Sequence, residues 1–242
     1  MKNISPDRLI PMDIFANNEP IAIDVVYARS NHPRNIFDEA IYHSKARLWT
    51  EYDMARIVIL AARKLHKTYS RTLSLKDCLR TYDAQEAMQH TQIVKDHPEW
   101  MEGEFRLLSA PGHGAHPRGM AIDVCAIDKN GNEIDMGTEF DEMTEKSARN
   151  YTEFSDEILQ NRLMLENAFV ESAKELNLEI LPLPSEWWDF RFPSKHYAQY
   201  EPLHDSDLPP QMRMVSTDGP NISNFSDDHF EKLKNDILNS LN

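Results

Sequence analysis

The feature that constrains the fold most is a short apolar segment with a carboxylate in its middle. Residues 120–127 read Met-Ala-Ile-Asp-Val-Cys-Ala-Ile, a pattern that predicts a buried strand. A carboxylate in such a strand is costly to bury unless it is paired or bound to a metal ion. We therefore expect the folded chain to bring a cationic partner to Asp123.

A glycine-rich loop with two histidines leads directly into this strand. It runs Pro-Gly-His-Gly-Ala-His-Pro-Arg-Gly over residues 111–119. His116 and Asp123 are seven residues apart, so on one straight strand their side chains would face opposite sides. The segment 117–119 can supply the bend that lets both side chains point at one ion.

A second polar pair lies in the aromatic segment 184–192, where Glu186 and Asp189 stand among four aromatic rings. Desolvation by these rings would raise the pKa of one carboxyl group towards the range of a general base. A nearby cation would instead keep the other carboxylate ionised. Each motif alone has an ordinary structural interpretation, since Asp189 could pair with Arg191, but together they favour a metal site.

The remaining pattern predicts the fold class. We expect strands over 21–27, 73–79, 120–127, 133–136 and 187–192, the third and fourth joined by a turn at Asn130-Gly131. We expect helices over 51–67, from an N-cap at Asp83 to Lys95, and over 156–176 with residues 159, 163, 165, 169 and 173 facing inward. These elements are interspersed without strict alternation, which favours an α+β fold with a mostly antiparallel central sheet flanked by helices.

The domain organisation follows from the same pass along the chain. Residues 1–20 are polar and turn-rich and predict a loosely held lead-in, and residues 21–200 form the main domain. The polar segment 201–242 is a C-terminal extension with a short helix over 227–241. Its apolar face either packs on the main domain or forms a subunit contact in a homo-oligomer.

Composition and charge exclude several function classes. The net charge of −14 argues against a nucleic-acid partner, because phosphate backbones need a basic face. The longest apolar run, residues 57–62, is far shorter than the roughly 20 residues that a membrane helix needs. The N-terminus shows no apolar secretion signal, and Cys78 and Cys125 are expected to be reduced core thiols, so we expect a cytoplasmic protein.

Several motifs resemble one known family. The segment Gly114-x-His116-x-x-Gly119-x-Ala121-x-Asp123 is similar to the Ser-x-His-x-x-Gly-x-Ala-x-Asp signature of the vancomycin-resistance-type D-alanyl-D-alanine dipeptidases. The Glu-Trp-Trp sequence at 186–188 resembles the start of their Glu-x-x-His segment, and residues 135–141 resemble a third block. Asp77-Cys78-Leu79-Arg80 is a diverged form of a fourth. The likeness extends from about residue 21 to residue 192.

The resemblance implies a fold shared with lysostaphin-type and hedgehog-type domains, and a zinc ion held by His, Asp and His with a water in the open position. Carried over to this chain, His116 and Asp123 are metal ligands and Glu186 is the base that activates the water. Arg80 stabilises the oxyanion, and Asp141 binds the ammonium end of the dipeptide.

Two positions depart from the family pattern. Gly114 stands where the signature has Ser, so a hydroxyl that could contact substrate is absent. Asp189 stands where the third ligand, a His, is expected, and one His with two Asp shifts the preference from zinc towards harder ions such as manganese. Three interpretations stay open: Asp189 is a ligand, it supports a site completed by His196 or His113, or the site is poor in metal and catalytically weak.

The sequence therefore predicts a metalloprotease-type hydrolase, a metal-dependent dipeptidase that cleaves D-Ala-D-Ala or a similar small cell-wall-derived peptide. One alternative is a hydrolase of another small amide or peptide, with a specificity altered at Gly114. The other is a non-catalytic binding module with a degraded metal site. Glu186, Arg80 and Asp141 favour the enzyme, because a pure binder has no need of a general base.

Overall fold

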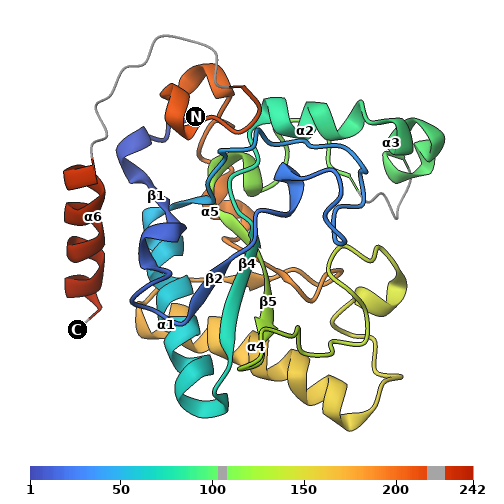
Figure 1. Cartoon of the computed structure of the whole chain (residues 1–242), viewed down its shortest axis with the longest axis vertical. Coiled ribbons are helices and arrows are strands. Elements are labelled where there is room, and N and C mark those ends of the chain that lie inside the picture. Colours follow the sequence, from blue (N-terminus) through green and yellow to red (C-terminus); the bar gives the residue numbers. More distant parts are fainter. Residues whose placement is uncertain (103–107, 217–226, 242) are drawn as a thin grey trace.

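A five-stranded sheet forms the centre of the computed structural model, which describes residues 1–102, 108–216 and 227–241 (Figure 1). The strand order is β2 (Ile21–Ile23), β4 (Thr72–Asp77), β5 (Ala121–Ile127), β7 (Asp189–Arg191) and β6 (Leu181–Pro182). Only the β2–β4 pair within this sheet is parallel. A second sheet pairs β1 (Leu9–Pro11) with β3 (Trp49–Glu51) in antiparallel fashion. The predicted α+β fold with a mostly antiparallel sheet is confirmed.

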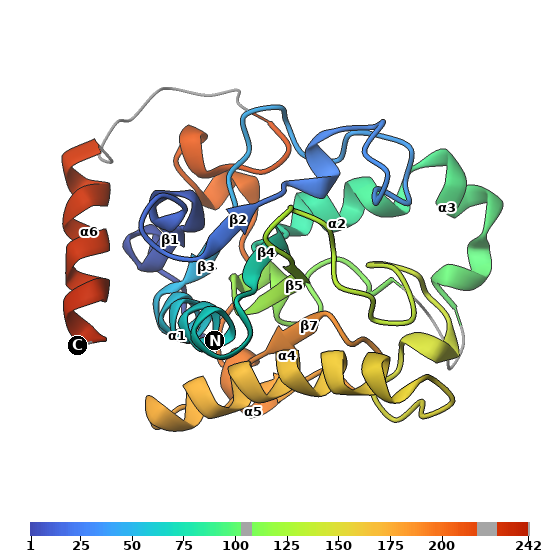
Figure 2. The same cartoon turned by 60° about the horizontal axis from the view of Figure 1, so that its bottom comes forward.

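Two long helices build the core beneath this sheet. Helix α1 (Tyr52–Tyr69) packs against α4 (Asp156–Glu175) and β4, and Figure 2 shows α4 running under the sheet with α1 beside it. Phe169 of α4 stacks on Phe190 of β7 with ring centroids 4.0 Å apart, which ties the helix to the strand that carries Asp189. The shorter helices are α2 (Tyr82–Gln89), α3 (Gln92–Asp96), α5 (Ser194–Tyr197) and α6 (Asp227–Ser240).

A tight backbone contact fixes the start of β5. Gly119 has a φ of 61°, in the left-handed region that favours glycine. Its carbonyl oxygen accepts hydrogen bonds from the Glu51 amide at 2.7 Å and from the Thr50 hydroxyl at 2.9 Å. A Cβ at this position would lie 3.3 Å from the Glu51 nitrogen, so a side chain here would push the loop and β3 apart, and glycine avoids this.

The N-terminal segment is not loosely held, contrary to our expectation. Strand β1 pairs with β3, and five apolar side chains of the first 20 residues are buried: Ile4, Leu9, Ile10, Met12 and Phe15. Intervening polar residues hid this pattern, and the pairing partner lies about 40 positions further along the chain.

Other local predictions were correct in type and wrong in extent. The N-cap of α2 is Thr81 rather than Asp83, and the chain leaves the helix at His90 before α3 begins. The strand predicted at 21–27 ends at Ile23, and the expected hairpin strand at 133–136 is reduced to one bridge between Ile127 and Glu133. Leu163, expected to face inward, is 47% exposed because Arg162 and Met164 turn towards the core instead.

The C-terminal helix α6 packs on the main body. Phe230 and Ile237 are buried, and α6 contacts the 3-10 turn Met12–Phe15 (Figure 1). This favours the packing interpretation; a subunit contact stays a prediction. Residues 217–226 and 242 of the expected extension lie outside the described residues.

Two further expectations concern burial. Cys78 and Cys125 are buried free thiols, as predicted. Within the described ranges, the helices all fall short of the length and apolar character required to span a membrane.

Candidate metal and active site

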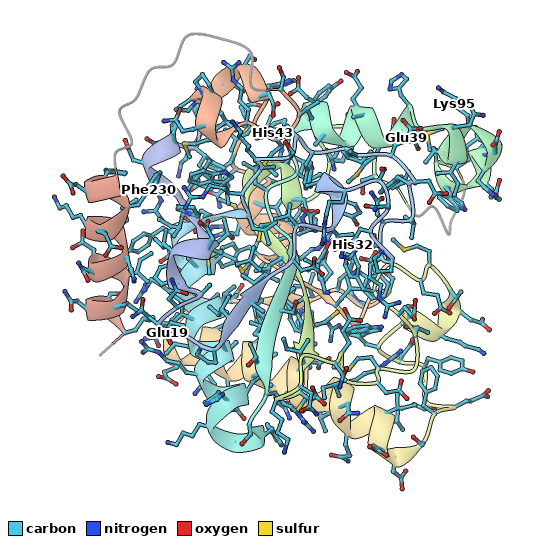
Figure 3. The ribbon with its side chains drawn as sticks, viewed as in Figure 1. Glu19, His32, Glu39, His43, Lys95 and Phe230 are labelled. Carbon is cyan, nitrogen blue, oxygen red and sulfur yellow. The ribbon has the colours of Figure 1, made fainter. Side chains whose placement is uncertain are left out.

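One pocket gathers every residue for which the sequence predicted a role. Its lining includes the seven predicted residues, namely Arg80, Gly114, His116, Asp123, Asp141, Glu186 and Asp189. They come from the ends of β4, β5 and β7 and from the loops between them. His113 also lines this pocket, whereas His43, labelled in Figure 3, has its ring nitrogen 2.9 Å from the Arg213 carbonyl oxygen.

The sheet register places two of the carboxylates side by side. Asp123 on β5 is the direct cross-strand partner of Asp189 on β7, so both side chains project from the same face. His116 precedes β5 in the 3-10 turn His116–Arg118, which supplies the bend expected at residues 117–119. Strand pairing and this turn together bring the three side chains to one point.

The imidazole of His116 is oriented as metal-binding histidines usually are. Its Nδ1 lies 2.7 Å from the Cys78 carbonyl oxygen, so Nδ1 donates a proton there and Nε2 is the nitrogen that a cation would bind after displacing its proton. Nε2 lies 3.4 Å from Asp123 Oδ1 and 3.2 Å from Asp189 Oδ2. Burial alone would lower the pKa of His116, but the negative charge of Asp123 dominates and raises it to about 10 without a cation.

Asp123 supplies the most direct indication of a cation. Its Oδ1 atom is buried and has no hydrogen-bond partner among the described residues. Buried carboxylate oxygens in folded proteins are normally paired. An unpartnered carboxylate oxygen beside a histidine nitrogen and a second carboxylate is a donor set that fits a divalent cation.

Among the described residues, the group of potential ligands whose atoms all lie within 4.8 Å of one another is Asp77 with His116 and Asp123, which contains Asp77 in place of the predicted Asp189. Asp77, however, already accepts hydrogen bonds from the Tyr42 hydroxyl at 2.7 Å and from Arg80 Nε at 2.8 Å. It also faces the Nδ1 side of His116, at 3.8 Å, where the ring donates to Cys78. Because Asp189 lies on the Nε2 side of His116 and Asp77 on the Nδ1 side, we favour the group that contains Asp189.

Asp189 also carries the ion pair that the sequence suggested. Arg191 Nε donates to Asp189 Oδ1 at 2.7 Å, and Arg191 Nη2 donates to Oδ2. Burial would raise the pKa of Asp189, but the charge of Arg191 holds it well below its usual range. Of the two alternative ligands, His113 lines the pocket, whereas His196 packs against the Phe192 ring.

Burial raises the pKa values of three carboxyl groups of the pocket, those of Asp123, Glu186 and Asp141. Burial raises the pKa of Glu186 to about 8, and the negative charge of Asp189 adds to the effect. Burial also raises the pKa of Asp141 to about 7, although the Tyr27 hydroxyl donates a hydrogen bond to its Oδ2. Glu186 is therefore close to the range in which a carboxylate accepts protons efficiently.

Arg80 is held rigidly at the pocket by groups that the sequence reasoning missed. Besides its bond to Asp77, its guanidinium lies 5.6 Å from the centre of the Tyr27 ring, and Nη2 is 3.4 Å from Asp123 Oδ2. Asp77 stands three residues before Arg80 within the same motif, and that spacing was the available signal. Tyr27 and Tyr42 gave none, because distant segments bring them to the site.

Comparisons with known proteins agree with this arrangement. A family model described as D-ala-D-ala dipeptidase (peptidase M15) matches residues 12–207. The D-alanyl-D-alanine dipeptidase of Escherichia coli (strain K12) is 38% identical over 90 residues, which cover 37% of this chain and 42% of that protein. The D-alanyl-D-alanine dipeptidase of Synechocystis sp. (strain ATCC 27184 / PCC 6803 / Kazusa) is 33% identical over 100 residues, which cover 37% of this chain and 38% of the relative. The aligned region thus spans less than half of either relative.

Proposed function

The chain belongs to the D-Ala-D-Ala dipeptidase family, and we propose that it is a metal-dependent dipeptidase for D-alanyl-D-alanine or a similar small cell-wall-derived peptide. The observation that carries this proposal is the unpartnered Oδ1 atom of Asp123, buried beside His116 in a pocket that Glu186 also lines. Oδ1 makes no hydrogen bond among the described residues, and its ion-pair contact with His116 Nε2 is long, at 3.4 Å, so a cation held between the two atoms would supply the missing partner.

In this proposal His116 Nε2 and carboxylate oxygens of Asp123 and Asp189 hold one divalent cation. Zinc is the expected ion, and two carboxylates with one imidazole also suit manganese. When bound, the cation supplies the Lewis acidity that polarises the scissile carbonyl group and lowers the pKa of water.

Glu186 moves the protons in the proposed reaction. Its carboxylate takes a proton from the attacking water and returns it to the nitrogen of the leaving amine when the peptide bond breaks. The raised pKa of Glu186 supports both steps, because a group that titrates near neutral pH both accepts and releases protons readily.

Arg80 and Asp141 bind the substrate around the scissile bond. Arg80, fixed by Asp77, would stabilise the negative charge that develops on the carbonyl oxygen without having to reorganise. Asp141 would accept the ammonium end of the dipeptide. Burial disfavours its ionised form, and a substrate cation would restore that form.

The same pocket is compatible with two alternative functions. A hydrolase of another small amide is compatible with Gly114, which lacks the hydroxyl group of the family's serine. Its φ of 83° favours glycine at this position. A binding module without turnover would need no base at the position of Glu186. The expected cytoplasmic location and homo-oligomer stay predictions.

The test is metal analysis of the purified protein, followed by a panel of dipeptides with zinc or manganese restored. We expect metal-dependent release of free amine from D-alanyl-D-alanine, and its loss in Glu186→Gln. Turnover of other small amides alone would favour the second function. Binding of dipeptide without release of amine would favour the third.

A further inference from the structure

Arg191 ends β7 and lines the pocket next to the proposed metal site. Residues two apart on a strand project from the same face, so Arg191 lies beside Asp189. Its cross-strand partners are Ala121 on β5, whose small side chain takes up little space, and Leu181 on β6. The Arg191 side chain is 16% exposed, so it is largely enclosed but still reachable from the pocket.

Only one edge of the Arg191 guanidinium is used within the protein. A guanidinium carries five N–H donors in a planar fork. Nε and Nη2 donate to Asp189, and across residues 1–102, 108–216 and 227–241 no hydrogen bond engages Nη1. The second edge of the fork is therefore available to a ligand.

This unused edge faces the position at which the chain departs from its family. Nη1 lies 3.9 Å from the point that a Cβ on Gly114 would occupy. Apart from the chain neighbours of Gly114, it is the only described atom within 4 Å of that point. The missing side chain of Gly114 thus leaves space directly beside a guanidinium group.

The charges of the pocket make Arg191 the natural place for an anion. Asp123, Asp141, Glu186 and Asp189 line the pocket and would repel a carboxylate. The other cationic lining residue, Arg80, already contacts Asp77 and Asp123. Arg191 combines a positive charge, free donors and a planar fork that matches a carboxylate.

We propose that Arg191 is a specificity-determining residue that binds the free C-terminal carboxylate of the substrate through Nη1. This inference rests on the proposed function and narrows it. Asp141 binds the ammonium end and Arg191 binds the carboxylate end of the substrate. The pocket therefore accepts a dipeptide and discriminates against peptide amides and longer peptides.

The experiment compares D-alanyl-D-alanine with its C-terminal amide, D-alanyl-D-alaninamide, in the metal-loaded protein. We expect kcat/KM of the wild type to be about 10- to 100-fold higher for the acid, since a charge-assisted hydrogen bond is lost with the amide. Arg191→Gln should lower kcat/KM for the acid more than for the amide, by a factor close to the wild-type preference, so that the acid-to-amide ratio falls towards one. Arg191→Lys should keep part of the preference, because it retains the charge but not the fork.

A purely structural role for Arg191 gives a different result. If Arg191 only holds Asp189, Arg191→Gln will lower kcat/KM equally for acid and amide and will change the metal content. That outcome, or a wild type without preference for the acid, would overturn the inference. Arg149→Gln is the matched control, because Arg149 Nη2 donates to the Asp189 backbone oxygen at 3.0 Å without lining the pocket. It should leave the acid-to-amide ratio unchanged.

Binding measurements separate this inference from the proposed function. If the wild type cleaves neither compound with either metal, the proposed function fails, and calorimetric binding of the acid and the amide still tests Arg191. Tighter binding of the acid, lost in Arg191→Gln, would support the inference, and equal binding would refute it. If circular dichroism shows that Arg191→Gln does not fold, the inference is tested instead by the acid-to-amide ratios of Arg191→Lys and of the wild type.

Discussion

Asp123→Asn tests the metal site at Asp123, whose Oδ1 atom makes no hydrogen bond among the described residues. In the wild type, a divalent cation at about 100 times its dissociation constant adds about 2.7 kcal/mol to the free energy of unfolding. For a domain of this size the corresponding rise in Tm is about 5–10 °C. Asparagine keeps the shape of Asp123 but supplies no anionic oxygen, and a loss of affinity of about 100-fold is expected. The same cation concentration then adds only about 0.4 kcal/mol, a rise of about 1 °C.

Scanning calorimetry of the metal-free proteins, with and without zinc or manganese at one pH, measures this difference. Asp156→Asn, at the exposed start of α4, is the control and should keep the full rise in Tm. Asp77→Asn should also keep it, because Asp77 faces Nδ1 of His116, which is bonded to the Cys78 carbonyl oxygen. An undiminished rise in Asp123→Asn would show that the cation binds elsewhere. Loss of the rise in Asp77→Asn would instead make Asp77 a ligand.

Three further predictions concern the chemistry of the pocket. Glu186→Gln should keep metal binding and lower kcat by about 10² or more. In the wild type, kcat/KM should rise with pH, with a midpoint at or below about pH 8. The reason is that the base works only when deprotonated and that a bound cation would lower its pKa. A pH–rate profile without that limb, or a fully active Glu186→Gln, would remove Glu186 from this role. Asp189→His should raise the affinity for zinc and sharpen the preference for zinc over manganese, and Asp189→Ala should weaken metal binding. If neither variant changes the measured metal affinity, His113 becomes the next candidate ligand. Asp141→Asn should raise KM for a free dipeptide by roughly 10-fold or more and leave KM for an N-acetylated dipeptide unchanged. If steady-state assays show the same change in KM for both dipeptides, Asp141 does not bind the ammonium group.

Local sequence patterns predicted the elements whose burial follows a regular period. Helix α1 was expected over residues 51–67 and spans Tyr52–Tyr69, and α4 was expected over 156–176 and spans Asp156–Glu175. Strand β5 was likewise evident from its apolar run. The motifs around His116 and Asp189 identified the pocket residues because each motif keeps its functional groups close together in the chain.

The sequence by itself thus determined the fold class, the long helices and seven of the residues that line the pocket. Only the tertiary structure decided how those residues meet. The pairing of β5 with β7 puts Asp123 opposite Asp189, and the same pairing turns Arg191 towards Gly114. The physical reason is that cross-strand register and the burial of β1 depend on contacts between segments far apart in the chain, which no local period encodes.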